Sequence, residues 1–301
     1  MTSRCSIIAV LGAPNVGKST LVNCLVGGKI SIVSPKAQTT RARVMGICTH
    51  GPAQLIFVDT PGIFSPRRRL DRAMVASAWG GAAKADITLL LVDSKSGLDQ
   101  DTREIIKELR KSCRGEHDET VLALNKIDLI KKPPLLDLAQ AFAGQALFTE
   151  IFMISAISGD GVDDLSAYFA RLAPEGPWLF PEDQLSDMPE RLHAAEITRE
   201  KLYLQLHHEL PYAVAVETEN WREKKDGSIK IGQVIYVERT SQKSIVLGKN
   251  GQRIKALGEA ARMELEDILG RRVHLFLFVK VRKDWAENPE RYRDLGLDHN
   301  V

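Results

Sequence analysis

Cysteine is scarce in this sequence, and long apolar runs are absent. The four cysteines lie far apart and form no CxxC pair, which argues against a disulfide framework and against a zinc site. The longest apolar run, Ile87–Val92, has the length of a strand and falls far short of the ~20 residues that span a bilayer. A Gly-rich loop follows the first short apolar stretch without the small-residue cleavage pattern of a signal peptide. We therefore expect a cytoplasmic protein.

An excess of charge of either sign is also lacking. The chain has 41 Lys and Arg residues against 39 Asp and Glu, a formal net charge of +2, so the overall charge says little about partners and local clusters matter more. The hydrophobic content of 44% and the charged content of 27% are ordinary for a soluble globular protein. A length of 301 residues suits two domains, at roughly 100–200 residues per domain.

Strand and helix patterns alternate through residues 1–172. Each apolar run ends at a small or polar residue that begins a loop, and Arg43–His50 is a further candidate for an edge strand. Nearly continuous apolar strands separated by helical patterns predict a doubly wound α/β domain, with a buried parallel sheet covered on both faces. The predicted buried strands are Ser6–Leu11, Leu55–Asp59, Ile87–Asp93, Thr120–Asn125 and Ile151–Ser155. The helical patterns include Lys18–Leu25, Asp101–Cys113 and Val162–Leu172.

Four prolines interrupt residues 173–189, which we interpret as a linker. The following region has the order helix, strand, strand, helix, helix, strand and predicts an α+β domain at 190–285, before a tail at 286–301. Its predicted elements are Pro189–Glu209, Ala213–Trp221, Ile229–Thr240, Ser241–Leu247, Gln252–Leu269 and the strictly alternating strand Val273–Val281.

The strongest motif is Gly12–Ser19, which reads G-x-x-x-x-G-K-S between a predicted strand and a predicted helix, as a phosphate-binding loop requires. Its glycines let backbone amides wrap phosphates at the positive end of the helix. Lys18 would reach the β- and γ-phosphates, and Ser19 would bind Mg²⁺. By chance the pattern arises in about 1% of chains of this length. The predicted phosphate-site residues are Gly12, Ala13, Pro14, Asn15, Val16, Gly17, Lys18, Ser19 and Thr20.

Two further motifs follow at strand ends. Asp59 can hold Mg²⁺ through water, and Gly62 lets its amide approach the γ-phosphate. Alone, the sequence Asp59, Thr60, Pro61 and Gly62 is an ordinary turn. After a phosphate loop it indicates a nucleotide sensor, here called the sensor turn.

The second motif selects the base: a carboxylate at Asp128 accepts from the N1–H and amino donors of guanine, which adenine lacks. The predicted base-site residues are Asn125, Lys126, Asp128, Ser155 and Ala156. Asn125 would tie this loop to the phosphate loop, and Lys126 would lie along the base. Ser155 and Ala156 would offer a backbone amide to guanine O6.

These motifs, in unpermuted order over residues 4–172, resemble the translation-factor class of small GTPases. Ile63 stands where Ras-like proteins have a nearby Gln that orients the attacking water, so the resemblance implies slow intrinsic hydrolysis. In some relatives the residue matching Asn15 helps to hold K⁺; alternatively, Asn15 only shapes the loop. The first switch belongs at Ser34–Arg43, where either Thr40 or Thr39 would bind Mg²⁺. The implied catalytic residues are Asn15, Lys18, Thr40, Asp59 and Gly62, with Ser19 and Thr40 as metal ligands.

The segment Gly248–Gly251 reads G-K-N-G between two predicted helices. KH domains use such a GXXG loop to clamp about four nucleotides of single-stranded RNA. Five basic residues and no acidic residue lie between Arg239 and Lys255. The element order resembles the bacterial, type II, KH fold, whereas the alternative is a helix–turn–helix connection with solvated lysines. The predicted RNA-binding residues are Gly248, Lys249, Asn250, Gly251, Arg253 and Lys255.

A phosphate-loop GTPase followed by a type II KH domain at this length resembles the Era family of bacterial ribosome-assembly GTPases over nearly the whole chain. The resemblance implies GTP hydrolysis, GTP/GDP and Mg²⁺ as ligands, and binding to the 3′ end of small-subunit ribosomal RNA during subunit maturation. It also implies peripheral association with the inner face of the membrane, although no basic amphipathic segment supports this; we expect a monomer. The alternatives are an RNA chaperone that holds GTP as a structural cofactor and a GTPase of transfer-RNA modification.

Overall fold

The computed structural model describes residues 2–36, 38–66, 68–112, 119–206, 214–283, 285 and 289–299. The chain divides into two compact units, each built from more than one segment. The first comprises Met1–Ser31, Thr40–Asp187 and Tyr292–Val301, and the second comprises Ile32–Thr39 and Met188–Arg291. In the ranges just given, no helix has both the length and the apolar character needed to cross a bilayer.

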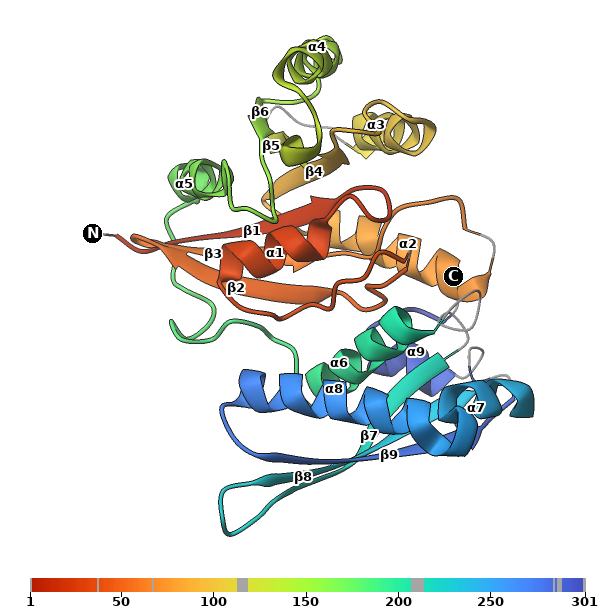
Figure 1. Ribbon diagram of the computed structural model, residues 1–301. Coiled ribbons are helices and arrows are strands. Elements are labelled where there is room, and N and C mark those ends of the chain that lie inside the picture. Colours follow the sequence, from red (N-terminus) through yellow and green to blue (C-terminus); the bar gives the residue numbers. More distant parts are fainter. Residues whose placement is uncertain are drawn as a thin grey trace. The chain divides into compact units, whose positions relative to one another are not determined.

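A six-stranded sheet forms the centre of the first unit (Figure 1). The strand order is β2-β3-β1-β4-β5-β6, and all neighbours are parallel except β2, which pairs antiparallel with β3 at the edge. The predicted doubly wound α/β fold, with an extra edge strand before β3, is therefore confirmed. The strands are β1 Arg4–Leu11, β2 Val44–His50, β3 Ala53–Asp59, β4 Ile87–Asp93, β5 Glu119–Asn125 and β6 Glu150–Met153.

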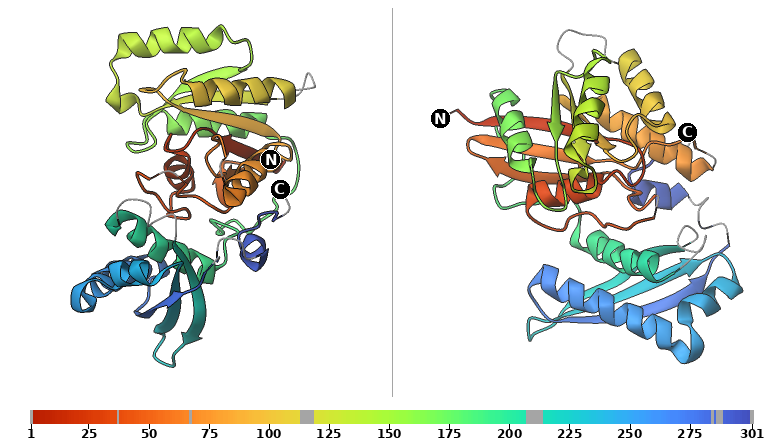
Figure 2. Two further views of the ribbon diagram at one scale, coloured as in Figure 1. Left: turned by 90° about the vertical axis from the view of Figure 1, so that its right-hand side faces the viewer. Right: turned by 45° about the horizontal axis from the view of Figure 1, so that its top comes forward.

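Helices cover both faces of this sheet, which explains why its central strands are almost wholly apolar. The left view of Figure 2 shows α1 and α2 on opposite sides of the strands. All seven residues of β3 are buried as a result. The helices of the unit are α1 Lys18–Val26, α2 Arg69–Ala82, α3 Gln100–Ser112, α4 Lys132–Ala143 and α5 Val162–Leu172, with a short 3₁₀ turn, η1, at Ile127–Leu129.

The Pro-rich segment predicted to be a linker is held on the first unit up to Asp187. The side chain of Gln54 in β3, fully buried, accepts from the amides of Leu179 and Phe180 and donates to the Phe180 carbonyl. A bridge between Gly46 and Ser186 continues this pairing along β2. The segment is therefore held by the side chain of Gln54 and by backbone pairing with β2, which is an edge strand of the sheet.

The second unit is a three-stranded sheet with three main helices packed on it. Strand β8 lies in the middle, antiparallel to β7 and parallel to β9. The GXXG loop connects α7 to α8, so the predicted order of elements is confirmed. The elements are α6 Glu190–Gln205, β7 Val214–Glu223, β8 Ile229–Val237, α7 Thr240–Leu247, the 3₁₀ turn η3 Lys249–Gly251, α8 Gln252–Leu269 and β9 Val273–Val281. Cys113, His207–Glu209 and Ala213, at ends of predicted elements, lie outside the described residues, as do 286–288, 300 and 301 of the predicted tail.

Two short segments belong to the unit that is distant from them in sequence. Ile32–Thr39 is part of the second unit, where Ile32 is buried among residues of α6, β8, α8 and β9. The amide of Val33 donates to Glu200 Oε1 (2.7 Å), and Arg199 donates to the Thr39 carbonyl (2.5 Å). Conversely, Tyr292–Val301, which includes the end of α9 (Pro289–Asp294), is part of the first unit. Tyr292 is buried there against α2.

Candidate nucleotide site and candidate RNA interface

The phosphate loop spans the gap between the end of β1 at Leu11 and the start of α1 at Lys18. Its two glycines are required because both have a positive φ and because a Cβ at either position would clash with a neighbouring atom. Gly12 has φ of 152°, and a Cβ there would lie 2.4 Å from the carbonyl oxygen of Leu91. Gly17 has φ of 101°, and a Cβ there would lie 2.5 Å from Asn125 Nδ2. Side chains at these positions would therefore displace the strands and loops that surround the phosphate site.

Lys18 is buried at the first position of α1, with 6% of its surface exposed. Its Nζ donates to the carbonyls of Gly12 (3.0 Å) and Ala13 (2.9 Å), so the ammonium lies inside the curve of the loop. Burial lowers the pKa of Lys18 to about 8, and the nearby Asp59 carboxylate opposes this shift. A buried cation at a helix N-terminus is well placed to bind the phosphate oxygens that the loop encloses.

The structure brings together the residues that were predicted to hold Mg²⁺. Ser19 Oγ and Thr40 Oγ1 lie 2.7 Å apart. Asp59 is fully buried, and neither of its carboxylate oxygens has a hydrogen-bond partner in the part of the chain that the structure describes. Burial raises the pKa of this carboxyl, whereas the Ser19 hydroxyl and the Lys18 ammonium lower it. A buried carboxylate without a partner is costly unless a cation neutralises it, so this donor set fits Mg²⁺.

The geometry distinguishes the two candidate switch threonines. Whereas Thr40 contacts Ser19, the hydroxyl of Thr39 is hydrogen-bonded within its own segment, to Ser34 Oγ (2.6 Å) and to the Lys36 carbonyl (2.7 Å). Thr40 is therefore the one positioned to share a metal ion with Ser19.

The sensor turn lies directly against the phosphate loop. Thr60 Oγ1 donates to the carbonyl of Val10 (2.6 Å), and the Ile63 amide donates to the carbonyl of Gly12 (3.1 Å). A Cβ at Gly62 would lie 2.9 Å from Pro14 Cα, so only glycine allows this approach. Ile63 itself is 7% exposed and has no group that could orient water.

The loop after β5, which carries the base-site residues Asn125, Lys126 and Asp128, is tied to the phosphate loop by two side chains. Asn125, 2% exposed, donates from Nδ2 to the carbonyl of Val16 (2.8 Å). Lys126 donates to the Asn15 carbonyl (2.7 Å) and forms an ion pair with Asp93 (2.7 Å). The tie expected of Asn125 is therefore present. The sequence did not suggest Asp93, although its place at the carboxyl end of β4 is where a functional residue would be sought.

Asp128 and Ser155 meet beside this loop, where Ser155 Oγ donates to Asp128 Oδ1 (2.7 Å). One carboxylate oxygen is thereby held in place, which orients the side chain. The Ala156 amide donates to Asn125 Oδ1 (2.9 Å), so it holds the loop together, and its expected contact with guanine O6 stays a prediction. Asp128 and Ser155 also line a pocket of about 380 Å³.

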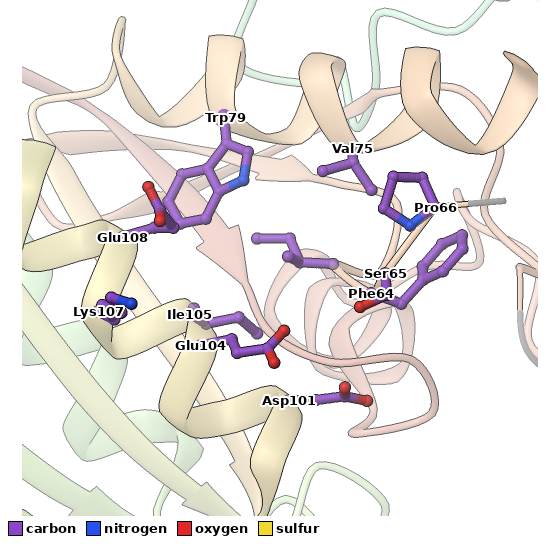
Figure 3. A pocket seen from close by; sticks show the side chains of 11 residues that line it. Phe64, Ser65, Pro66, Val75, Trp79, Asp101, Glu104, Ile105, Lys107 and Glu108 are labelled. Atoms are coloured by element: carbon purple, nitrogen blue, oxygen red, sulfur yellow. The ribbon is translucent and has the colours of Figure 1, made fainter.

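A second pocket, of about 360 Å³, lies beside the sensor turn (Figure 3). It is formed by residues 63–66, which follow the sensor turn, by Val75 and Trp79 of α2, and by one side of α3. Its α3 side carries Asp101, Glu104, Lys107 and Glu108. Since the segment after Gly62 forms one wall, a change in that segment would alter the pocket.

The GXXG loop has a backbone that its glycines and Asn250 make possible. Gly248, Asn250 and Gly251 all have φ between 51° and 74°. A Cβ at Gly248 would lie 2.6 Å from Arg253 Cβ, whereas nothing lies within 4 Å of one at Gly251. Arg253 donates to the carbonyl of Ile245 (2.7 Å), which joins α8 to the end of α7. Among the predicted RNA-binding residues, the side chains of Lys249, Asn250, Arg253 and Lys255 are exposed.

Known proteins match both parts of the chain. A family model described as 50S ribosome-binding GTPase matches residues 7–126, and a KH domain model matches residues 209–286. GTPase Era of Brucella melitensis is 57% identical over 296 residues, which cover 98% of this chain and 94% of the relative. GTPase Era of Rhizobium meliloti is also 57% identical, covering 98% and 93%. The chain belongs to the Era family of GTPases.

Solved structures of the family match nearly the whole chain. A crystal structure of Era in complex with MgGDPNP and nucleotides 1506–1542 of 16S ribosomal RNA has a TM-score of 0.92 at 40% identity, covering 98% of this chain and 99% of that one. A variant of Aquifex aeolicus Era bound to GDP·AlF4⁻ has a TM-score of 0.91 at 40% identity, covering 97% and 99%. As an Era-family member, this protein is a GTPase that carries a KH domain.

Proposed function

We propose that this Era-family GTPase binds the 3′-terminal region of 16S ribosomal RNA through its KH domain, and that GTP hydrolysis switches the RNA-bound state during assembly of the small ribosomal subunit. The observation that carries the proposal is the match over 98% of the chain to an Era complex that contains both MgGDPNP and nucleotides 1506–1542 of 16S ribosomal RNA. The exposed basic GXXG loop is suited to single-stranded RNA.

GTP is held by three groups of residues in this account. The phosphate loop with Lys18 binds the phosphates, while Ser19 and Thr40 hold Mg²⁺, with Asp59 acting through water. The sensor turn brings the Gly62 amide to the γ-phosphate. Asp128 accepts from the donors of guanine, and its carboxylate is oriented by Ser155. Mg²⁺, when bound, neutralises charge that develops on the transferred phosphate.

Hydrolysis needs a water molecule in line with the γ-phosphate, and Ile63 cannot orient it. We assign that task to the backbone of the sensor turn or to a partner, so intrinsic hydrolysis is slow. Asn15, exposed at the tip of the phosphate loop with φ of 64°, is assigned to K⁺, which would neutralise phosphate charge beside Lys18.

The finer features of the proposal concern organisation and location. We place the GTP-binding domain at residues 1–172, a linker at 173–189, the KH domain at 190–285 and a tail at 286–301. The protein acts as a cytoplasmic monomer, with peripheral association with the inner face of the cell membrane, and its RNA contacts are the GXXG residues with Arg253 and Lys255.

Crosslinking to total cellular RNA with a GTP analogue bound, followed by mapping of the crosslinked positions, tests the proposal. We expect the crosslinks to concentrate near the 3′ end of 16S ribosomal RNA. Crosslinks concentrated on transfer RNA would contradict it. A chaperone with a structural nucleotide is disfavoured because Thr40, Asp59 and Gly62 form a γ-phosphate sensor that such a protein does not need; equal crosslinking with GDP would favour it.

A further inference from the structure

The sheet of the second unit has one face packed against helices and one open face. Helices α6, α7 and α8 share a single buried cluster with Ile235 and Val279 of the sheet. Because successive side chains of a strand alternate between faces, the residues between the inward-facing ones point away from the helices. On β9, Leu275 and Leu277 pack toward the core, so Phe276 and Phe278 lie on the open face.

These two phenylalanines are unusually exposed for their size, at 46% for Phe276 and 57% for Phe278. They also lie on the edge strand of the sheet, since β9 pairs with β8 on one side only in the described residues. An edge strand with exposed apolar side chains is prone to association with other chains, and proteins usually avoid it. The helices pack on the opposite face, so they leave both rings accessible.

Several cations lie on the same face as the two rings. The Nζ of Lys230 lies 5.0 Å from the centroid of Phe276, and the guanidinium of Arg282 lies 5.9 Å from the centroid of Tyr236 on the same face. Arg222 is opposite Lys230 in the register of β7 and β8. Two carboxylates share the face, Glu217 and Glu219, and Glu219 holds Lys280 at 2.9 Å.

We propose that this open face, defined by Lys230, Phe276, Phe278 and Arg282 and named the sheet platform, is a second RNA-binding surface that stacks unpaired bases. The proposal rests on the proposed function, because the RNA is the one whose backbone the GXXG loop clamps. Aromatic rings on an open sheet bind bases by stacking in other RNA-binding modules, and neighbouring cations attract the phosphates.

The spacing on β9 suits successive bases. Phe276 and Phe278 are two residues apart on one face of the strand, which separates them by roughly 7 Å. Gly232, which lies opposite Phe276 in β8, has no side chain to cover the ring. Two consecutive unstacked bases can therefore each stack on one of the two rings along β9.

Single-stranded RNA fits the platform better than an anionic membrane does. A membrane is a flat plane of negative charge, and it would meet Glu217 and Glu219 together with the rings. An RNA strand is flexible and can pass between Lys230 and Arg282 while it avoids the carboxylates. Sedimentation with anionic vesicles tests the membrane alternative.

The double variant Phe276→Ala/Phe278→Ala tests the proposal in the full-length protein with a GTP analogue bound. The probe is RNA corresponding to nucleotides 1506–1542 of 16S ribosomal RNA, together with truncations of it from either end. We expect the double variant to bind the full probe roughly 30-fold more weakly or more, the loss expected from removing two base-stacking surfaces. The loss should vanish once truncation removes the bases that reach the platform. Met263→Ala, which removes another exposed apolar side chain of this unit (59% exposed), is the matched control and should change nothing.

The outcomes separate this inference from the function on which it rests. Lys249→Asp/Asn250→Asp should weaken binding to every truncation; if it weakens none, the proposed function fails. If that variant weakens binding but Phe276→Ala/Phe278→Ala binds the full probe as tightly as the wild type, only the sheet platform is overturned.

Phe278→Trp should keep RNA affinity, and the fluorescence of the added tryptophan should be quenched by RNA. Thermal unfolding of each variant checks the fold. Sedimentation with anionic phospholipid vesicles that depends on the two rings, together with unchanged RNA binding, would replace RNA with a membrane.

Discussion

The two sites of this protein are built in opposite ways. In the nucleotide site, side chains from separate loops hold one another: Asn125 and Lys126 bind the backbone of the phosphate loop, and Ser155 holds Asp128. In the GXXG loop, backbone conformation dominates, with positive φ at three of the four positions and exposed side chains. A small ligand that is bound by several loops needs a preorganised site, whereas an RNA backbone needs a close approach and positive charge.

Asp128→Asn should have the largest effect. The substitution replaces one accepting carboxylate oxygen with an NH2 donor, which cannot accept from the amino group of guanine. We expect GTP affinity to fall about 100-fold, as for the loss of a hydrogen bond to a charged group. Xanthosine triphosphate carries an oxygen in place of the amino group and should bind the variant better than GTP does.

Asp137→Asn, at an exposed position of α4, removes the same charge and should leave the GTP affinity unchanged. Isothermal titration with both nucleotides gives the comparison. Unaltered GTP affinity in Asp128→Asn would remove the base site from the account.

Asn125→Ala tests whether the loops of the nucleotide site depend on side chains. The substitution breaks buried bonds to Val16 and Ala156, and leaving such groups unpaired costs about 1–3 kcal/mol of the free energy of unfolding. Denaturant unfolding without nucleotide measures this loss in the free energy of unfolding directly. A variant as stable as the wild type would show that the two loops are held by backbone alone, as in the other site.

The glycines of the GXXG loop should differ from each other. Gly251→Ala introduces only the strain of positive φ, about 1–2 kcal/mol, because nothing lies near the new Cβ. Gly248→Ala adds a contact of 2.6 Å with Arg253 Cβ, so it should lower the free energy of unfolding further and weaken RNA binding more. Equal effects in unfolding and in RNA titration would mean that backbone conformation alone matters at both positions.

These predictions draw on features that the sequence shows to different degrees. Local periodicity is strong in Gln252–Leu269 and in Val273–Val281, and both elements have the predicted bounds. The phosphate loop is likewise recognisable because its chemistry needs those residues in sequence. The ion pair between Lys126 and Asp93 and the packing of Ile32–Thr39 in the second unit join residues that are distant in the chain, and no local pattern encodes such contacts.

The smallest effect concerns K⁺. Hydrolysis should be slow, because Ile63 cannot orient water, and a few-fold faster in K⁺ than in Na⁺ as one further charge is neutralised. Asn15→Ala should abolish the difference between the two salts. Phosphate release measured at equal ionic strength checks both points. Equal turnover of the wild type in both salts would leave Asn15 as a residue that only shapes the loop.

The central claim is that the nucleotide state controls RNA binding. Thr40, which contacts Ser19 in the nucleotide site, directly follows Thr39, whose carbonyl is bound by Arg199 of the second unit. Filter binding of RNA corresponding to nucleotides 1506–1542 should therefore show tighter binding with a GTP analogue than with GDP, within the 5- to 150-fold range typical of coupled sites. By reciprocity, the RNA should raise affinity for the GTP analogue over GDP by the same factor. Equal RNA affinity in the two nucleotide states of the wild-type protein would contradict the account.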